Sequence, residues 1–184
     1  MKKLSVLFIA MFCLFSFTAN AQISGGATLG LQAPMGDFAD AANMGVGINL
    51  FGKYMLSENM AVGANLGYNR FGGEEWNFGD GDYDVSYSMI PITGLFEYHF
   101  GGDAIKPYVG ADLGMYSFGA RVKYAGESES DSDLYFGLAP VAGILYDLNE
   151  SLKLCANIKL HNIFAEGESL SWIGINAGVV IPFN

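Results

Sequence analysis

The sequence contains few cysteines and few basic residues, and both shortages limit what the protein can be. Its two cysteines are Cys13 and Cys155, and Cys13 lies in an N-terminal segment that we expect to be removed. One remaining cysteine cannot form an internal disulfide. Lys and Arg together number 9 against 19 Asp and Glu, for a formal net charge of −10. Because no basic stripe is available to neutralise phosphates, the composition argues against a nucleic-acid partner.

Long apolar runs are also missing from most of the chain, although 51% of its residues are hydrophobic. After residue 22, Gly, Asn or a charged residue interrupts every apolar stretch before it reaches the roughly 18 residues of a transmembrane helix. An apolar chain without long apolar runs needs another explanation. Strands that expose one face to lipid provide it, because only every second residue must then be apolar.

The N-terminus has the three parts of a secretory signal peptide. It begins with a basic Met-Lys-Lys, continues with an apolar run over residues 4–17, and reaches Ala-Asn-Ala at residues 19–21. This order predicts a signal peptide at residues 1–21, cleaved between Ala21 and Gln22, and therefore export. A retained membrane anchor is the alternative, but the run is shorter than the about 20 residues that span a bilayer. Loss of the two leader lysines takes the formal charge from −10 to −12.

The mature part alternates between apolar and small or polar residues with a period of two. In residues 23–33, the odd positions carry Ile, Gly, Ala or Leu, and the even positions carry Ser, Gly, Thr or Gln. This period indicates β-strands with one apolar face. Similar alternation recurs in residues 46–53, 62–69, 108–116, 152–161 and 173–183, and less cleanly in residues 90–100 and 136–148, where some apolar residues fall on the polar face.

Short and long connections alternate between these strands. Tight turns are expected near residues 57–59, 101–103 and 149–151, and long polar loops near residues 34–43, 72–84, 119–133 and 165–170. Three tight turns and four long loops join eight strands and place both termini at one end. We therefore predict that residues 22–184 form an all-β, eight-stranded antiparallel up-and-down transmembrane β-barrel.

A soluble sandwich or a soluble barrel would also alternate, so the character of the two faces decides between them. The polar faces are rich in Gly and Asn and carry few charges, which suits the crowded interior of a small barrel better than a water-exposed sheet. A closed ring also satisfies the backbone hydrogen-bonding groups within lipid. Aromatic residues near the strand ends are typical of the girdles at lipid headgroups; they are Tyr54, Tyr68, Tyr98, Phe100, Tyr146 and Phe183.

Four segments in order carry a family resemblance. They are Pro-Met-Gly-Asp-Phe-Ala-Asp at residues 34–40, Tyr-Met-Leu-Ser-Glu-Asn at 54–59, Lys-Pro-Tyr-Val-Gly-Ala-Asp-Leu-Gly at 106–114, and the closing Pro-Phe-Asn at 182–184. With these segments, residue 22 to the end resembles the outer membrane protein β-barrel domain family, often called porin-family proteins, of the OmpA/OmpX-like small barrels. The resemblance implies an outer-membrane location, lipid as a partner and assembly by the barrel-insertion machinery.

Charged residues of both signs fall on the faces that we expect to point into the barrel. A functional interpretation makes them a pore lining or a proton site. We favour a structural network of ion pairs, because buried charges need partners and the two signs are nearly balanced. Asp147 and Lys153 flank one tight turn and are placed to pair across it. The predicted network consists of Lys53, Glu97, Asp112, Asp147, Lys153 and Lys159.

The sequence offers little for catalysis. His99 and His161 fall on lumen faces, but neither has a visible nucleophile, and Cys155 has no adjoining base. Residues 80–84, Asp-Gly-Asp-Tyr-Asp, open like a calcium loop but are not followed by the Gly and Glu of that motif. We therefore expect no enzyme activity, no cofactor, and neither a catalytic nor a metal site.

Three functions fit these predictions. In the leading hypothesis the protein has a structural or surface-interaction role, with termini and tight turns in the periplasm and long acidic loops outside. The loops carry Trp76, Phe78 and Tyr83 as contacts for a surface partner. The second hypothesis is a narrow porin-like channel for small solutes, which a filled lumen disfavours. The third is a soluble periplasmic barrel that binds an apolar ligand.

Overall fold

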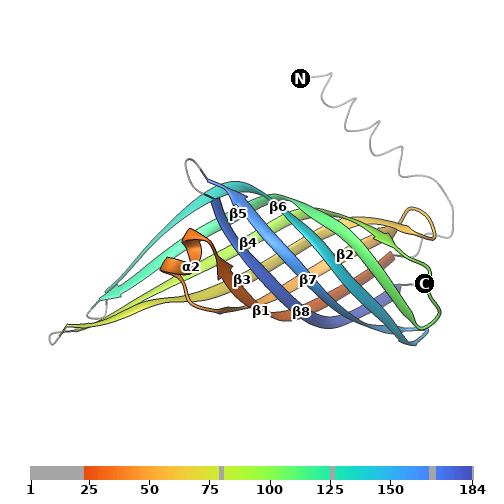
Figure 1. Cartoon of the computed structure of the whole chain (residues 1–184), viewed down its shortest axis with the longest axis horizontal. Helices are drawn as coiled ribbons and strands as arrows, with labels where there is room; N and C mark the ends of the chain where they lie inside the picture. The colour runs from red at the N-terminus through yellow and green to blue at the C-terminus, as the bar shows by residue number, and fades with distance from the viewer. Residues whose placement is uncertain (1–22, 79–80, 125–126, 166–168, 184) are drawn as a thin grey trace, which may run out of the picture.

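The computed structural model describes residues 23–78, 81–124, 127–165 and 169–183, which form a closed barrel of eight antiparallel strands (Figure 1). Each strand pairs with its neighbour in sequence, and the first pairs with the last to close the ring. The predicted eight-stranded up-and-down barrel is therefore confirmed. The strands are β1 (Ile23–Met35), β2 (Gly45–Met55), β3 (Met60–Phe78), β4 (Gly81–His99), β5 (Ile105–Tyr124), β6 (Glu127–Asn149), β7 (Leu152–Phe164) and β8 (Ser169–Phe183).

The two faces of the ring differ as the sequence period predicts. In β1, Leu29 is 66% exposed on the outer face, whereas its neighbour Thr28 is 3% exposed inside. Apolar side chains thus cover the outside, which is the reverse of a soluble barrel and argues against the third hypothesis. The irregular positions of β4 and β6 also point inward, because Met89, Leu95 and Val141 are buried. No helix among the described residues is long and apolar enough to cross a bilayer.

The seam that closes the barrel depends on a glycine. Gly178 of β8 pairs with Thr28 of β1. A Cβ atom at Gly178 would overlap the carbonyl oxygen of Ala27 and crowd the Cα of Thr28. The absence of a side chain therefore allows the first and last strands to approach, and this approach removes the free edges that lipid cannot satisfy.

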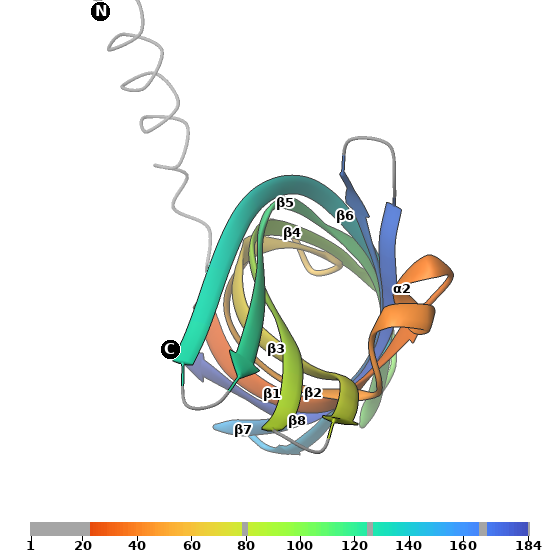
Figure 2. The same ribbon diagram turned by 90° about the vertical axis from the view of Figure 1, so that its left-hand side faces the viewer.

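The two ends of the barrel are unlike each other. At one end, called here the turn end, lie the first residue of β1, the last residue of β8 and the three short turns that join β2–β3, β4–β5 and β6–β7. At the other, the hairpin end, β3–β4 and β5–β6 reach far past the other strands (Figure 1). The view along the barrel shows how the strands curve around into a closed ring (Figure 2).

The prediction of irregular loops at residues 72–84 and 119–133 is wrong. Pairing between β3 and β4 continues to Phe78 and Gly81, and pairing between β5 and β6 continues to Tyr124 and Glu127. Gly, Ser and Asp suggested strand ends, but strand pairing depends on backbone hydrogen bonds that do not require apolar side chains. These two strand pairs therefore extend beyond the closed part of the barrel. Asp80, Glu166, Glu168 and the predicted cleavage site at Ala21 and Gln22 lie outside the described residues.

The loop predicted near residues 34–43 contains a short helix, α2 (Asp37–Ala41). Gly36 precedes it with a φ of 59°, a left-handed conformation that glycine adopts without strain. This turn directs Phe38 to a buried position against Phe71 of β3, with ring centroids 5.1 Å apart. The connection between β1 and β2 therefore covers part of the lumen at the hairpin end.

Candidate functional site

The first charged cluster of the lumen joins β2 and β4 across β3. Lys53 Nζ lies 2.7 Å from Glu97 Oε1, and His99 Nε2 lies 3.1 Å from Glu97 Oε2. The intervening strand presents only Ala61 and Gly63 at this level, in register with Glu97 and Lys53 respectively. Because these two residues are small, the long lysine side chain can cross β3 and reach its partner.

The second cluster repeats this arrangement on the opposite side. Lys159 of β7 lies 2.5 Å from Asp112 of β5, and both side chains are almost completely buried. The strand between them, β6, presents Ala139 opposite Asp112 and Val141 opposite Lys159. Burying either charge alone would be costly, so the pair makes both charges tolerable in the lumen.

The third cluster lies at the turn end and is only partly buried. Asp147 Oδ2 is 2.5 Å from Lys106 Nζ, and Asp147 Oδ1 is 3.3 Å from Lys153 Nζ. The structure thus brings the six residues of the proposed network into three separate clusters rather than one. Lys106 was missed, although it lies two residues before the inward Tyr108, and strand alternation places it on the same face.

A chain of hydrogen bonds between amide and aromatic side chains crosses the middle of the lumen. Trp172 Nε1 donates to Gln32 Oε1 at 3.1 Å, and Gln32 Nε2 donates to Asn176 Oδ1 at 3.1 Å. Asn176 Nδ2 then donates to Asn157 Oδ1 at 3.0 Å, and Asn157 Nδ2 donates to Tyr108 Oη at 3.2 Å. This chain ties β8, β1, β7 and β5 together through their inward side chains.

The hairpin end of the lumen contains an aromatic cluster. Its fully buried centre consists of Phe71, Tyr116 and Trp172, and Phe38 packs over it from α2. His161 belongs to this cluster, because its ring stacks on Trp172 at 4.4 Å and bonds to the Tyr116 hydroxyl at 3.1 Å. The alternation of the sequence also indicates this position, because Phe71 and Trp172 fall on the polar, inward faces of their strands.

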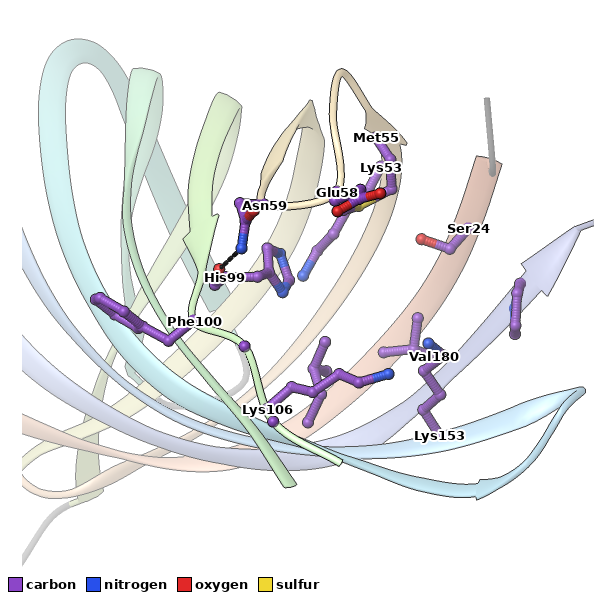
Figure 3. A pocket seen from close by; sticks show the side chains of 14 residues that line it. Ser24, Lys53, Met55, Glu58, Asn59, His99, Phe100, Lys106, Lys153 and Val180 are labelled. Atoms are coloured by element: carbon purple, nitrogen blue, oxygen red, sulfur yellow. Dashed lines mark hydrogen bonds between the residues drawn. The ribbon is translucent and has the colours of Figure 1, made fainter. Parts of the chain in front are cut away.

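The turn end is open. A cavity of about 220 Å³ lies there, with Lys53 and His99 on one side and Lys106 and Lys153 on the other (Figure 3). Asn59 Nδ2 donates to the His99 carbonyl at 2.8 Å and ties the β2–β3 turn to this wall. The cavity therefore gives access from the turn end as far as the first ion-pair cluster.

The two histidines and the cysteine of the lumen have the following surroundings. His99 contacts Glu97 and stacks on Tyr108, while His161 contacts Tyr116 and Trp172. Cys155 is buried. Within the described ranges, no group of three or more His, Cys, Asp or Glu residues is arranged to hold a metal ion. The lumen residues thus contact one another and form the interior of the barrel.

Comparison with known proteins agrees with this architecture. Residues 4–183 match the family described as outer membrane protein beta-barrel domain. No curated protein sequence matches the chain. Among solved structures, Neisserial surface protein A has a TM-score of 0.62 at 17% identity and covers 90% of this chain and 100% of its own. A major outer membrane protein from Thermus thermophilus has a TM-score of 0.58 at 13% identity, covering 90% and 100%.

A third similar structure is Ail, the attachment invasion locus protein of Yersinia pestis, in complex with the heparin analogue sucrose octasulfate. Its TM-score is 0.56 at 19% identity, and the match covers 89% of this chain and 97% of that one. At such identities these structures show the shared fold. The family match spans nearly the whole chain, and the strands close into a ring with an apolar outer face; the protein therefore belongs to the outer membrane protein β-barrel domain family and resides in the outer membrane.

Proposed function

We propose that this protein is a non-enzymatic outer-membrane barrel that is closed to solutes and contacts partners at the cell surface through its acidic hairpins. The observation that carries the proposal is the content of the lumen. Two buried ion pairs lie inside the lumen, each between strands on either side of a third strand. An aromatic cluster that includes Phe38, Phe71 and Trp172 occupies the hairpin end. A solute would have to displace groups that satisfy one another, which costs free energy.

In this proposal residues 1–21 are a signal peptide, the turn end faces the periplasm and the hairpin end faces outside. The insertion machinery assembles the mature chain from residue 22. The hairpins β3–β4 and β5–β6 then extend from the cell surface. Eight acidic residues lie in these extensions; they are Glu74, Glu75, Asp82, Asp84, Glu127, Glu129, Asp131 and Asp133. A partner with a basic surface would be complementary to them.

Planar-bilayer recording tests the closed lumen. Purified protein inserted into the bilayer is expected to give no stable unit conductance, with a larger porin as the positive control for insertion and recording. Regular conductance steps would overturn the closed-lumen proposal.

The channel hypothesis has one observation in its favour. Several buried amide atoms on the inner faces of β2 and β3 have no hydrogen-bond partner among the described residues, in Asn49, Asn65 and Asn69. Polar atoms of this kind are commonly satisfied by internal water. The same recordings decide between ordered internal water without conductance and a continuous water path with it.

A protease test on intact cells addresses the orientation. Cleavage within residues 72–84 or 119–133 is expected from outside, whereas a site engineered into the turn at Glu58 should be protected until the outer membrane is opened. The reverse pattern would contradict the proposed orientation.

A further inference from the structure

The outer face of the barrel changes from apolar to polar within two residue rows near the hairpin end. Cross-strand partners define each row across β3, β4, β5 and β6. One row is entirely apolar and exposed; it consists of Leu66, Ile92, Met115 and Phe136. Four residues further along each strand, about 13 Å at the usual rise, the row consists of Arg70, Ser88, Gly119 and Ser132.

The row between them marks the edge of the lipid-facing band. Leu134 belongs to this middle row and is 59% exposed. Tyr68 is also exposed, and it lies two residues before Arg70 on the same face of β3. Tyrosine at such a position is typical of the headgroup region. The polar row therefore lies at the depth where the hydrocarbon ends and lipid headgroups begin.

A cavity of about 200 Å³ lies at this polar row. Arg70, Ser88 and Ser132 line it from three strands, and Ser86 and Arg121 line it from the next row toward the hairpin tips. Gly119 lies between Ser88 and Ser132 in the row, and its carbonyl oxygen accepts a hydrogen bond from Ser88 Oγ at 3.4 Å. Arg70 and Arg121 are exposed on the outer face.

The two arginines are unusual in this chain. They are its only arginines. The ion pairs found between described residues use lysine or histidine, and each lysine whose side chain is described takes part in one; these are Lys53, Lys106, Lys153 and Lys159. Neither Arg70 nor Arg121 is a member of an ion pair among the described residues. Both arginines therefore line one cavity, and no acidic residue is among the described residues that line it.

We propose that this cavity binds the phosphate group of a lipid headgroup in the leaflet that surrounds the hairpin end. The planar guanidinium group donates paired hydrogen bonds to phosphate oxygens, which suits arginine to this role. The depth of the cavity selects a lipid over a soluble phosphate compound, because a lipid brings its headgroup to that depth without additional cost. The site is distinct from the acidic hairpin tips and does not depend on the partner of those hairpins.

Native mass spectrometry on the whole barrel in an uncharged maltoside detergent tests the proposal, and its outcome does not depend on membrane orientation. The probes are a diphosphorylated glucosamine lipid and the same lipid without its phosphates. The wild-type barrel is expected to bind the phosphorylated lipid and to lose most of that binding when the phosphates are removed. Charge-assisted hydrogen bonds of this kind predict that Arg70→Ser with Arg121→Ser weakens binding roughly 10-fold to 100-fold.

A matched control removes two positive charges from the opposite end, as Lys106→Ser with Lys153→Ser. This control should bind the lipid as the wild type does, and Arg70→Lys with Arg121→Lys should bind with intermediate affinity, because charge is kept and the paired donors are lost. Gel migration without boiling verifies that each variant is folded; if the double serine variant is not, the single variants replace it. Equal weakening in the turn-end control, equal binding of both lipids, or displacement by inorganic phosphate at the concentration of the lipid would each overturn the proposal.

Discussion

Replacing Lys159 with methionine should destabilise the barrel strongly, because it leaves Asp112 without its partner inside the lumen. The two side chains are 2.5 Å apart and at most 10% exposed. Methionine preserves most of the lysine stem, so the packing against Val141 changes little. Removing one member of a buried pair typically costs about 3–5 kcal/mol. We therefore expect the free energy of unfolding to fall by about that amount.

The control is the same substitution at Lys106. Asp147 then keeps Lys153 at 3.3 Å, and its side chain is 28% exposed, so solvent and the second lysine limit the loss. A partly exposed pair of this kind contributes about 0–1 kcal/mol. The double variant Lys159→Met with Asp112→Asn should recover part of the stability lost by Lys159→Met alone, because no uncompensated charge remains.

Urea unfolding from lipid vesicles measures these differences. The two independent signals are the fluorescence of the two tryptophans, of which Trp172 is buried, and the gel migration of unboiled samples. The reasoning would be refuted if Lys159→Met and Lys106→Met lowered stability equally, or if the double variant were less stable than Lys159→Met.

Two further pairs of substitutions test the seam and the outer face. Gly178→Val should prevent closure of the barrel because a Cβ atom there overlaps the backbone of β1. The control Gly52→Ala should fold normally because no heavy atom lies within 4 Å of the added carbon. Gel migration with and without boiling distinguishes the two, and a folded Gly178→Val barrel would contradict the argument. Leu29→Arg in the middle of β1 should lower the free energy of unfolding in a bilayer by about 2–4 kcal/mol. Leu56 lies in the β2–β3 turn and is 51% exposed, so Leu56→Arg should lower it little. Equal effects in vesicle unfolding would show that the outer face does not contact lipid.

The sequence was sufficient to predict the strands because one face of each strand meets lipid. A single rule, an apolar residue at every second position, then applies to all eight strands and fixes which residues point inward. That rule also placed Lys53, Glu97, Asp112 and Lys159 in the lumen, where the structure has them. The alternation alone does not specify partners, because these depend on which small residues occupy the strand between.

Two features were beyond this rule for physical reasons. Outside the bilayer the apolar requirement ends, so β3–β4 and β5–β6 continue as paired strands with polar sequences that look like loops. The aromatic cluster at the hairpin end depends on Phe38, which comes from a short helix outside the strand pattern. Its position follows from a left-handed glycine and from packing, neither of which has a period that sequence alternation can reveal.

The most direct test of the barrel in its membrane is to measure which methyl groups contact lipid chains. Nuclear Overhauser spectra of the protein in lipid nanodiscs should show cross-peaks from acyl-chain protons to the methyl groups of Leu29, Leu31 and Ile175, which are all more than half exposed on the outer face. The methyl groups of Thr28 and Thr93, which are buried inside, should show none. Acyl-chain contacts at the threonines, or their absence at the three outer residues, would contradict a closed barrel with its apolar face in lipid.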